Sequence, residues 1–562
     1  MDKQTDFEIK DGELVKYHGN GGDIVIPDGV TNIGNHAFQD CTTITSVAFP
    51  ENMECYDNDY LAGYSSGIGG WAFSGCTGLK SITIPAGIHF IGNDAFKGCT
   101  SLTDVTILEG KIRIGEGVFE DCTSLEHISF PKVMSGVKIK FHYHTSHCII
   151  RARTFKGCTS LKSVVLPKAV TEITASSFEG CTALTEFEAS VEKIPAGAFQ
   201  NCTNLKKLTL HYTAVHIESD AFSGCTNLTD VTFTTRKKVD QRRKDSFGIH
   251  SPHIDGGAFR GCTNLTEFTL PKKYRGSLKV HDGVLYEVYK VWDGESIITL
   301  TLICCPPTKT KVQILDDTDR IGENAFWGCD NLTEIVLPEN VGRIWDSAFA
   351  HCDTLTKIVL PSNLKTIPAN AFRDCTVLSE IVLPANVKTI ETGAFCNCTA
   401  LKTLTIPEHI EKIGEGAFAG CENLKITYHG YTFPTTVREN FNLDAIRTMI
   451  ETKDFSVRMD LSVKYAVIFT MYFATPEDET ISAYIKKNFA KMFSYLIDMQ
   501  DSGAVKKILD TTSLVTKRNI DKFIQYAIDN KKHEIQVILM NHKTEKNWYD
   551  DVETTISKKF KL

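Results

Sequence analysis

The chain contains 562 residues, of which 42% are hydrophobic and 23% are charged, and its formal net charge is −8. A chain of this length has ample apolar material to bury a core. The mildly acidic balance argues against a general nucleic-acid-binding protein, because such proteins present a basic surface to phosphate groups. We therefore expect no nucleic-acid partner.

The start of the chain is predicted to form a β-hairpin. Apolar and polar residues alternate from Phe7 to Tyr17, and the Asp11-Gly12 pair between them suits the positive φ angles of a tight turn. A repeat array follows, and such an array needs a cap over its first coil. We therefore interpret residues 1–29 as an N-terminal hairpin cap.

One phrase then recurs along residues 30–271 and again along residues 313–434. Its pattern is I-x-x-x-A-F-x-x-C-x-x-L-x-x-I-x-L-P, and its last five cysteines, from Cys329 to Cys421, are 23 residues apart. A fixed period of this size is the signature of a solenoid, whose units bury their apolar faces against one another. The repeat cysteines are Cys41, Cys76, Cys99, Cys122, Cys158, Cys181, Cys202, Cys225, Cys262, Cys329, Cys352, Cys375, Cys398 and Cys421.

Each copy of the phrase predicts one short strand with one buried face. Ile358 and Leu360 are two residues apart, and Pro361 ends the strand because it has no N–H group to donate. Lys357 and Val359 should therefore face water, in a column of equivalent residues from parallel strands. The equivalent residues of the neighbouring copies are Glu334, Val336, Glu380 and Val382.

The other apolar positions of the phrase are predicted to fill the interior. The small alanine leaves room for the phenylalanine ring, which can stack on its equivalents in the coils above and below. Free cysteine is among the most buried residue types, so the repeat cysteines should pack rather than pair. The start of the chain also lacks the apolar segment of a secretory signal. We therefore expect a cytoplasmic location, with the cell surface, reached by unconventional export, as the alternative.

Residues 91–99, which read IGNDAFKGC, resemble the BspA-type leucine-rich repeat. The resemblance covers about residues 30–430, although the asparagine ladder of commoner leucine-rich repeats is missing. It implies an α/β-type right-handed leucine-rich repeat solenoid, rich in β-structure and with parallel strands. Proteins of this kind include bacterial and protist surface proteins that adhere to host matrix components.

Four intervals between repeat cysteines are longer than the usual 23 residues, and each extra segment falls between the end of a strand and the next Ala-Phe pair. These inserts should emerge on one side of the solenoid. Inserts that cluster on one face are often where repeat proteins bind partners, although long surface loops also persist because they cost little.

The second insert contains a cluster of candidate metal ligands, His142, His144, His147 and Cys148. The first two histidines would face the same way on an extended segment, and a bend could add the other two to complete a tetrahedral zinc site. The alternatives are a histidine-rich strand edge without a ligand and a thiol nucleophile at Cys148. Either chemistry would make the protein a metal-dependent or thiol enzyme.

The third insert contains a basic run formed by Arg236, Lys237, Lys238, Arg242, Arg243 and Lys244. Such a run can contact an acidic partner, an anionic lipid surface or phosphates, or it can simply be a solvated loop. No aromatic residue interleaves the basic ones, which argues against a single-stranded nucleic-acid site.

The largest insert, residues 272–312, contains the pairs Asp282-Gly283 and Asp293-Gly294 between alternating apolar runs. It echoes the N-terminal hairpin and predicts a second one. We therefore expect two repeat arrays in sequence, the second of which follows this inserted hairpin.

The repeat ends near residue 434, and residues 435–562 are predicted to form a small all-α domain. Phe489, Met492, Phe493 and Leu496 follow the spacing of one helix face. A second stripe contains Ile520, Phe523, Ile524, Ala527 and Ile528. The spacing of the two stripes along the chain is about that of one ankyrin repeat. The region therefore weakly resembles degenerate ankyrin repeats, although the loop signature of that family is missing.

Function is predicted from the repeat and not from a catalytic motif. The sequence contains no phosphate-binding G-x-x-x-x-G-K-[ST] loop, no H-E-x-x-H helix and no G-x-S-x-G elbow. Its longest late apolar run, Tyr465 to Ala474, is 10 residues long and too short to span a bilayer. We expect a non-enzymatic scaffold without a cofactor, which binds a protein partner through its faces and inserts. A surface adhesin is the alternative, and the sequence does not predict the ligand or the oligomeric state.

Overall fold

The computed structural model describes residues 6–50, 53, 67–108, 112–130, 148–167, 170–189, 191, 193–212, 216–235, 253–272, 277–293, 295–434 and 442–549. The chain divides into two compact units. The solenoid unit comprises Met1–Leu401 and His409–Cys421, and the helical unit comprises Lys402–Glu408 and Glu422–Leu562. The prediction of a parallel-strand solenoid, here of about 15 turns, followed by a small helical domain is confirmed.

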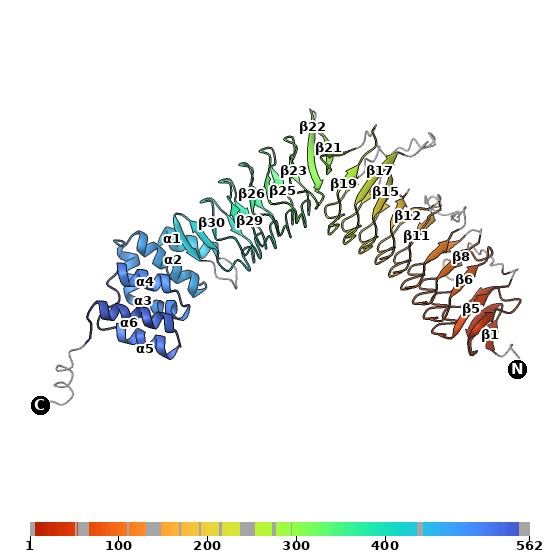
Figure 1. Ribbon diagram of the computed structural model, residues 1–562, viewed down its shortest axis with the longest axis horizontal. Coiled ribbons are helices and arrows are strands. Elements are labelled where there is room, and N and C mark those ends of the chain that lie inside the picture. Colours follow the sequence, from red (N-terminus) through yellow and green to blue (C-terminus); the bar gives the residue numbers. More distant parts are fainter. Residues whose placement is uncertain are drawn as a thin grey trace. The chain divides into compact units, whose positions relative to one another are not determined.

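Most coils contribute a strand to each of two rows, and the strands of each row pair in parallel (Figure 1). The first row, which contains the strand of the repeat phrase, is formed by β3 (Gly22–Val25), β5 (Ile44–Ala48), β6 (Ser81–Ile84), β8 (Asp104–Ile107), β10 (His127–Ser129), β13 (Glu186–Ala189), β15 (Lys207–Tyr212), β17 (Asp230–Thr235), β19 (Glu267–Thr269), β24 (Glu334–Val336), β26 (Lys357–Val359) and β28 (Glu380–Ile381). The second row is formed by β4 (Asn32–Ile33), β7 (Phe90–Ile91), β9 (Arg113–Ile114), β11 (Cys148–Ile150), β12 (Val170–Ile173), β14 (Lys193–Ile194), β16 (His216–Ile217), β18 (His253–Ile254), β23 (Arg320–Ile321), β25 (Arg343–Ile344), β27 (Thr366–Ile367), β29 (Thr389–Ile390) and β31 (Lys412–Ile413).

The corner of each coil is a tight turn that contains the Ala-Phe pair and the cysteine. The residue before the cysteine has a left-handed backbone, as in Gly98 with φ 72° and Asp121 with φ 60°. Glycine adopts this conformation without steric cost, and aspartate and asparagine tolerate it better than other residues. This requirement explains why most copies place glycine, aspartate or asparagine before the cysteine, with His351 as the exception.

The interior contains a row of stacked phenylalanine rings. Phe372 has no exposed surface, and its ring centroid lies 5.5 Å from that of Phe349 and 5.3 Å from that of Phe395. Equivalent stacks run through the first array, for example between Phe73 and Phe96 at 5.1 Å. The predicted ring stack is therefore present.

The repeat cysteines add a contact that the sequence analysis did not predict. The thiol of Cys122 donates a hydrogen bond to the backbone oxygen of Phe96 in the preceding coil at 3.1 Å, and Cys398 contacts Phe372 in the same way at 3.1 Å. Thirteen of the repeat cysteines are buried, Cys41 is partly buried, and all are free. The buried repeat thiols thus fill space and also tie one coil to the next.

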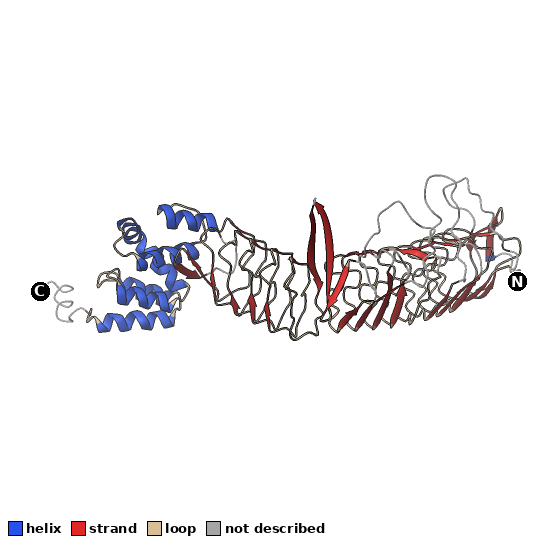
Figure 2. Cartoon of the chain, turned by 90° about the horizontal axis from the view of Figure 1, so that it is seen from above, coloured by secondary structure: helices blue, strands red, loops and turns tan. Residues whose placement is uncertain are grey.

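The inserted segment between the two arrays forms three antiparallel strands, β20 (Leu278–His281), β21 (Val284–Asp293) and β22 (Glu295–Cys304). The long β21–β22 hairpin stands out from the row of coils (Figure 2). The end of β22 pairs in parallel with β23. The backbone oxygen of Cys305 accepts a hydrogen bond from the Cys329 thiol, in the place that a phenylalanine oxygen takes in other coils. The hairpin therefore continues the ladder between the two arrays.

The helical unit begins with three strands, β30 (Thr403–Thr405), β32 (Lys425–Tyr428) and β33 (Tyr431–Pro434). In the described part of the unit, six helices follow: α1 (Leu443–Thr452), α2 (Leu461–Ala474), α3 (Glu479–Asp498), α4 (Ser502–Thr511), α5 (Ile520–Asp529) and α6 (His533–Glu545). The side chains of Asp460, Asp478 and Asp501 accept backbone N–H groups at the starts of α2, α3 and α4, which satisfies donors that lack a partner within the helix. None of the helices described is both long and apolar enough to cross a membrane.

The predicted helix faces agree with the structure in most positions. All four residues of the first stripe, from Phe489 to Leu496, are buried on α3. On α5, Ile520, Phe523 and Ala527 are buried, whereas Ile528 is exposed, because the stripe drawn from the sequence was wider than the contact face. The weak resemblance to ankyrin repeats stays a prediction.

Candidate functional site

The strand row of the second array presents an ordered outward face. The register pairs Glu334 with Lys357 and Val336 with Val359, and Lys357 in turn pairs with Glu380. Val336, Val359 and Val382 are 64%, 42% and 81% exposed, and we call these three residues the valine column. The outward register predicted from the sequence is therefore confirmed.

The valine column differs from the same strand position in the first array. That position is occupied there mainly by polar residues, namely Thr83, Thr106, Ser129, Glu188, Thr209, Thr232 and Thr269. Val165 is an exposed exception whose neighbours in the row are polar. Val25, which is 69% exposed, and Ala48 are a second exception, because they occupy this position in two neighbouring coils of the first array. The valine column is longer, with three apolar residues in consecutive coils. Single exposed apolar residues are common on proteins, whereas apolar residues that adjoin one another on a surface mark interaction sites. The outward direction of these valines follows from the sequence, and their run of three becomes visible when the copies of the two arrays are aligned.

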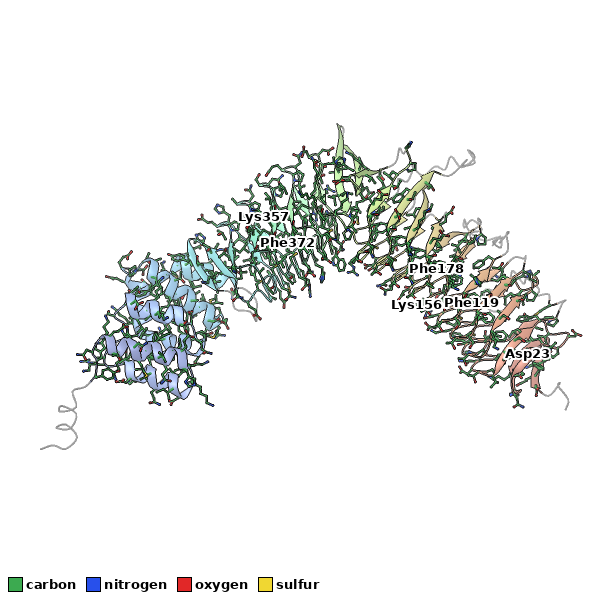
Figure 3. The ribbon with its side chains drawn as sticks, viewed as in Figure 1. Asp23, Phe119, Lys156, Phe178, Lys357 and Phe372 are labelled. Atoms are coloured by element: carbon green, nitrogen blue, oxygen red, sulfur yellow. The ribbon has the colours of Figure 1, made fainter. Side chains whose placement is uncertain are left out.

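Charged and hydroxyl side chains run alongside the valine column. The Lys357 ammonium lies 2.8 Å from Glu380 Oε2, and this contact raises the pKa of Lys357 above its usual value. Next to Lys357 along the chain, the Thr356 hydroxyl donates to the Thr333 carbonyl oxygen at 3.0 Å. The valines thus have polar side chains along one side, as apolar patches that bind proteins have polar rims. Figure 3 marks Lys357 on this face and Phe372 in the same array.

The residues proposed from the second and third inserts fall almost entirely outside the described part of the chain. His142, His144 and His147 are outside it, and Cys148 begins β11 without a described side chain. The basic run, Arg236, Lys237, Lys238, Arg242, Arg243 and Lys244, is also outside it. Both sites stay predictions.

The described thiols are arranged for packing. Burial raises the pKa of Cys158 and Cys181 above that of an ordinary thiol, so little thiolate forms near neutral pH. Burial also raises the pKa of Cys304 and Cys396. A thiol with a raised pKa is a poor nucleophile, so these four cysteines are better suited to packing than to catalysis.

Comparisons with known proteins agree with this architecture. The sequence matches the family described as BspA type leucine rich repeat region over residues 16–66, 61–147, 134–251 and 304–425. No curated protein matches the sequence significantly.

Several solved structures are similar. A leucine-rich cell surface protein from Faecalibacterium prausnitzii is 26% identical, with 74% of this chain and 90% of that chain covered and a TM-score of 0.47. A leucine-rich repeat protein from Bacteroides ovatus is 21% identical, with 74% and 87% covered and a TM-score of 0.40. The pneumococcal vaccine antigen PcpA is 19% identical, with 74% and 80% covered and a TM-score of 0.33.

The matched segments cover more than half of the chain, and they include most of the alanine, phenylalanine and cysteine positions that form the interior of the coils. The chain therefore belongs to the BspA-type leucine-rich repeat family.

Proposed function

We propose that the protein is a non-enzymatic scaffold that binds a partner protein through the strand face of its second array. The exposed valine column carries this proposal, because three adjoining apolar side chains face water in consecutive coils. Leucine-rich repeat proteins generally bind other proteins, which agrees with this use of the face.

The partner should present an apolar patch with charged residues of both signs around it. Glu334, Lys357 and Glu380 alternate in charge beside the valines, so a partner with a complementary order of charges would be favoured. Burying the exposed part of each valine should contribute roughly 1 kcal/mol. Together the three valines would account for about a hundredfold in affinity.

Substituting the valine column should remove binding without unfolding the chain. The purified full-length chain serves as bait in a lysate of its own organism. We expect the triple variant Val336→Asp, Val359→Asp, Val382→Asp to capture at least tenfold less of a partner protein than the wild type does. Quantitative mass spectrometry of the captured proteins measures this loss. The dissociation constant for the purified partner should then rise by about a hundredfold.

A matched control is available in the first array. The variant Thr83→Asp, Ser129→Asp, Thr269→Asp adds the same charge at exposed residues in the equivalent strand position and should capture the same proteins as the wild type. If the valine variant retains every partner that the control retains, this face is not the binding site.

We also infer that the protein works in a reducing compartment, the cytoplasm, because its repeat thiols serve as packing groups and hydrogen-bond donors in their free form. Protease added to intact cells should then leave the protein whole, while a known surface protein is degraded. Degradation of this protein under the same conditions would favour the alternative, a surface adhesin.

A further inference from the structure

Two histidines and three other polar side chains come together where the first array meets the inserted hairpin. His216 on β16 and His253 on β18 are register partners in neighbouring coils, and Asp255 directly follows β18. Glu287 and Tyr289 come from β21 of the hairpin. The cluster therefore joins three segments that are far apart in the sequence.

The histidines and the aspartate converge on one point. Asp255 Oδ1 lies 3.1 Å from His216 Nε2 and 3.0 Å from His253 Nε2, and the three possible ligand atoms lie within 4.8 Å of one another. Tetrahedral zinc with bonds of about 2.0–2.1 Å places neighbouring ligand atoms roughly 3.3 Å apart. The two nitrogen–oxygen separations are therefore already close to those of a zinc site.

Glu287 supplies the second feature that such a site requires. Its side chain is almost completely buried, and its Oε1 lies 2.9 Å from His253 Nδ1. The Tyr289 hydroxyl donates to its other oxygen at 2.5 Å, which fixes the carboxylate in place. A carboxylate that accepts a hydrogen bond from one ring nitrogen orients the imidazole and directs the lone pair of the other nitrogen toward a metal.

We propose that His216, His253 and Asp255 bind a zinc ion, with Glu287 as the positioning residue for His253. The two imidazoles and the carboxylate suit zinc, and the side chains of His216, His253 and Asp255 are 42%, 43% and 33% exposed, so that water can supply a fourth ligand. The ion would link the last two coils of the first array, and the hydrogen bond from His253 to Glu287 would connect the site to the inserted hairpin. This site is separate from the valine column and does not depend on the proposed function.

Metal titration of the full-length chain tests the proposal. After treatment with a chelator, the protein should bind zinc in isothermal titration calorimetry, and bound zinc should raise its melting temperature. Cobalt bound at the same site should give visible ligand-field bands without a sulfur-to-cobalt charge-transfer band. Such a spectrum would separate this site from one that contains Cys148.

Substitutions then locate the site. His216→Ala should lower zinc affinity at least a hundredfold, and Glu287→Gln should lower it about 10–100-fold through the loss of orientation. Lys193→Ala, at the same strand position one coil earlier, should leave the affinity unchanged, and so should the double variant His142→Ala, His144→Ala.

Asp255→Asn, which preserves the shape of the side chain, provides a second ligand variant if His216→Ala unfolds the chain. The proposal fails if the wild type binds no zinc, in which case the cluster is a hydrogen-bond network without a metal. It also fails if the folded ligand variants bind zinc as tightly as the wild type.

Discussion

Replacing Phe372 with alanine should lower the free energy of unfolding by about 3–5 kcal/mol. The side chain has no exposed surface and is stacked between the rings of Phe349 and Phe395, so its removal leaves a cavity that the coils on either side hold open. Urea denaturation monitored by far-ultraviolet circular dichroism measures this loss of unfolding free energy from the transition of the solenoid. The transition should move to a lower urea concentration with little change in slope.

Lys357→Ala is the matched control in the neighbouring coil. Lys357 lies on the outer face and pairs with Glu380 across exposed surface, where ion pairs contribute little to stability. Its urea midpoint should equal that of the wild type within experimental error. Equal effects of the two substitutions would show that the inward and outward positions are assigned incorrectly.

Replacing Phe493 with alanine should destabilise the helical unit by a similar amount, about 3–5 kcal/mol. Phe493 on α3 is fully buried. Its ring centroid lies 4.7 Å from that of Phe523 on α5 and 5.2 Å from that of Phe489. Because each unit has its own core, we expect the helical transition to shift while the solenoid transition stays in place. Differential scanning calorimetry can resolve the two transitions.

The control for this prediction is Lys487→Ala on the exposed side of the same helix, which should leave both transitions unchanged. If Phe493→Ala shifts the solenoid transition as strongly as the helical one, the two units do not unfold separately.

The interior of the solenoid could be predicted from the sequence because the same buried positions recur in every coil. The positions of Phe372 and Cys375 recur at a constant interval, so the face that each occupies follows from the period alone. The outward residues Lys357 and Val359 were predicted for the same reason. A hydrogen bond such as that from Cys122 to the Phe96 oxygen could not be predicted, because its direction depends on how one coil lies on the next.

The histidine cluster could not be recognised from the repeat period, because an insert lengthens the spacing between its two histidines. His216 and His253 are equivalent residues of neighbouring coils, but the third insert separates them by 37 residues instead of 23. Glu287 comes from the inserted hairpin, outside the repeat, so no spacing rule connects it with either histidine. Aligning the copies with the inserts removed would have placed the histidines together, whereas Glu287 required the structure.

The hairpin at the start of the chain has a consequence for how separate molecules behave. The second strand, β2 (Glu13–Tyr17), pairs in parallel with β4, but β1 (Phe7–Lys10) lies antiparallel to β2 and is the outer strand of that sheet. A strand of another molecule that ran parallel to β2 and β4 would therefore meet β1, which runs in the opposite direction, and could not extend the parallel ladder. A chain without residues 1–29 would lose this barrier and leave the edge of β4 free to pair in parallel with a strand of another molecule.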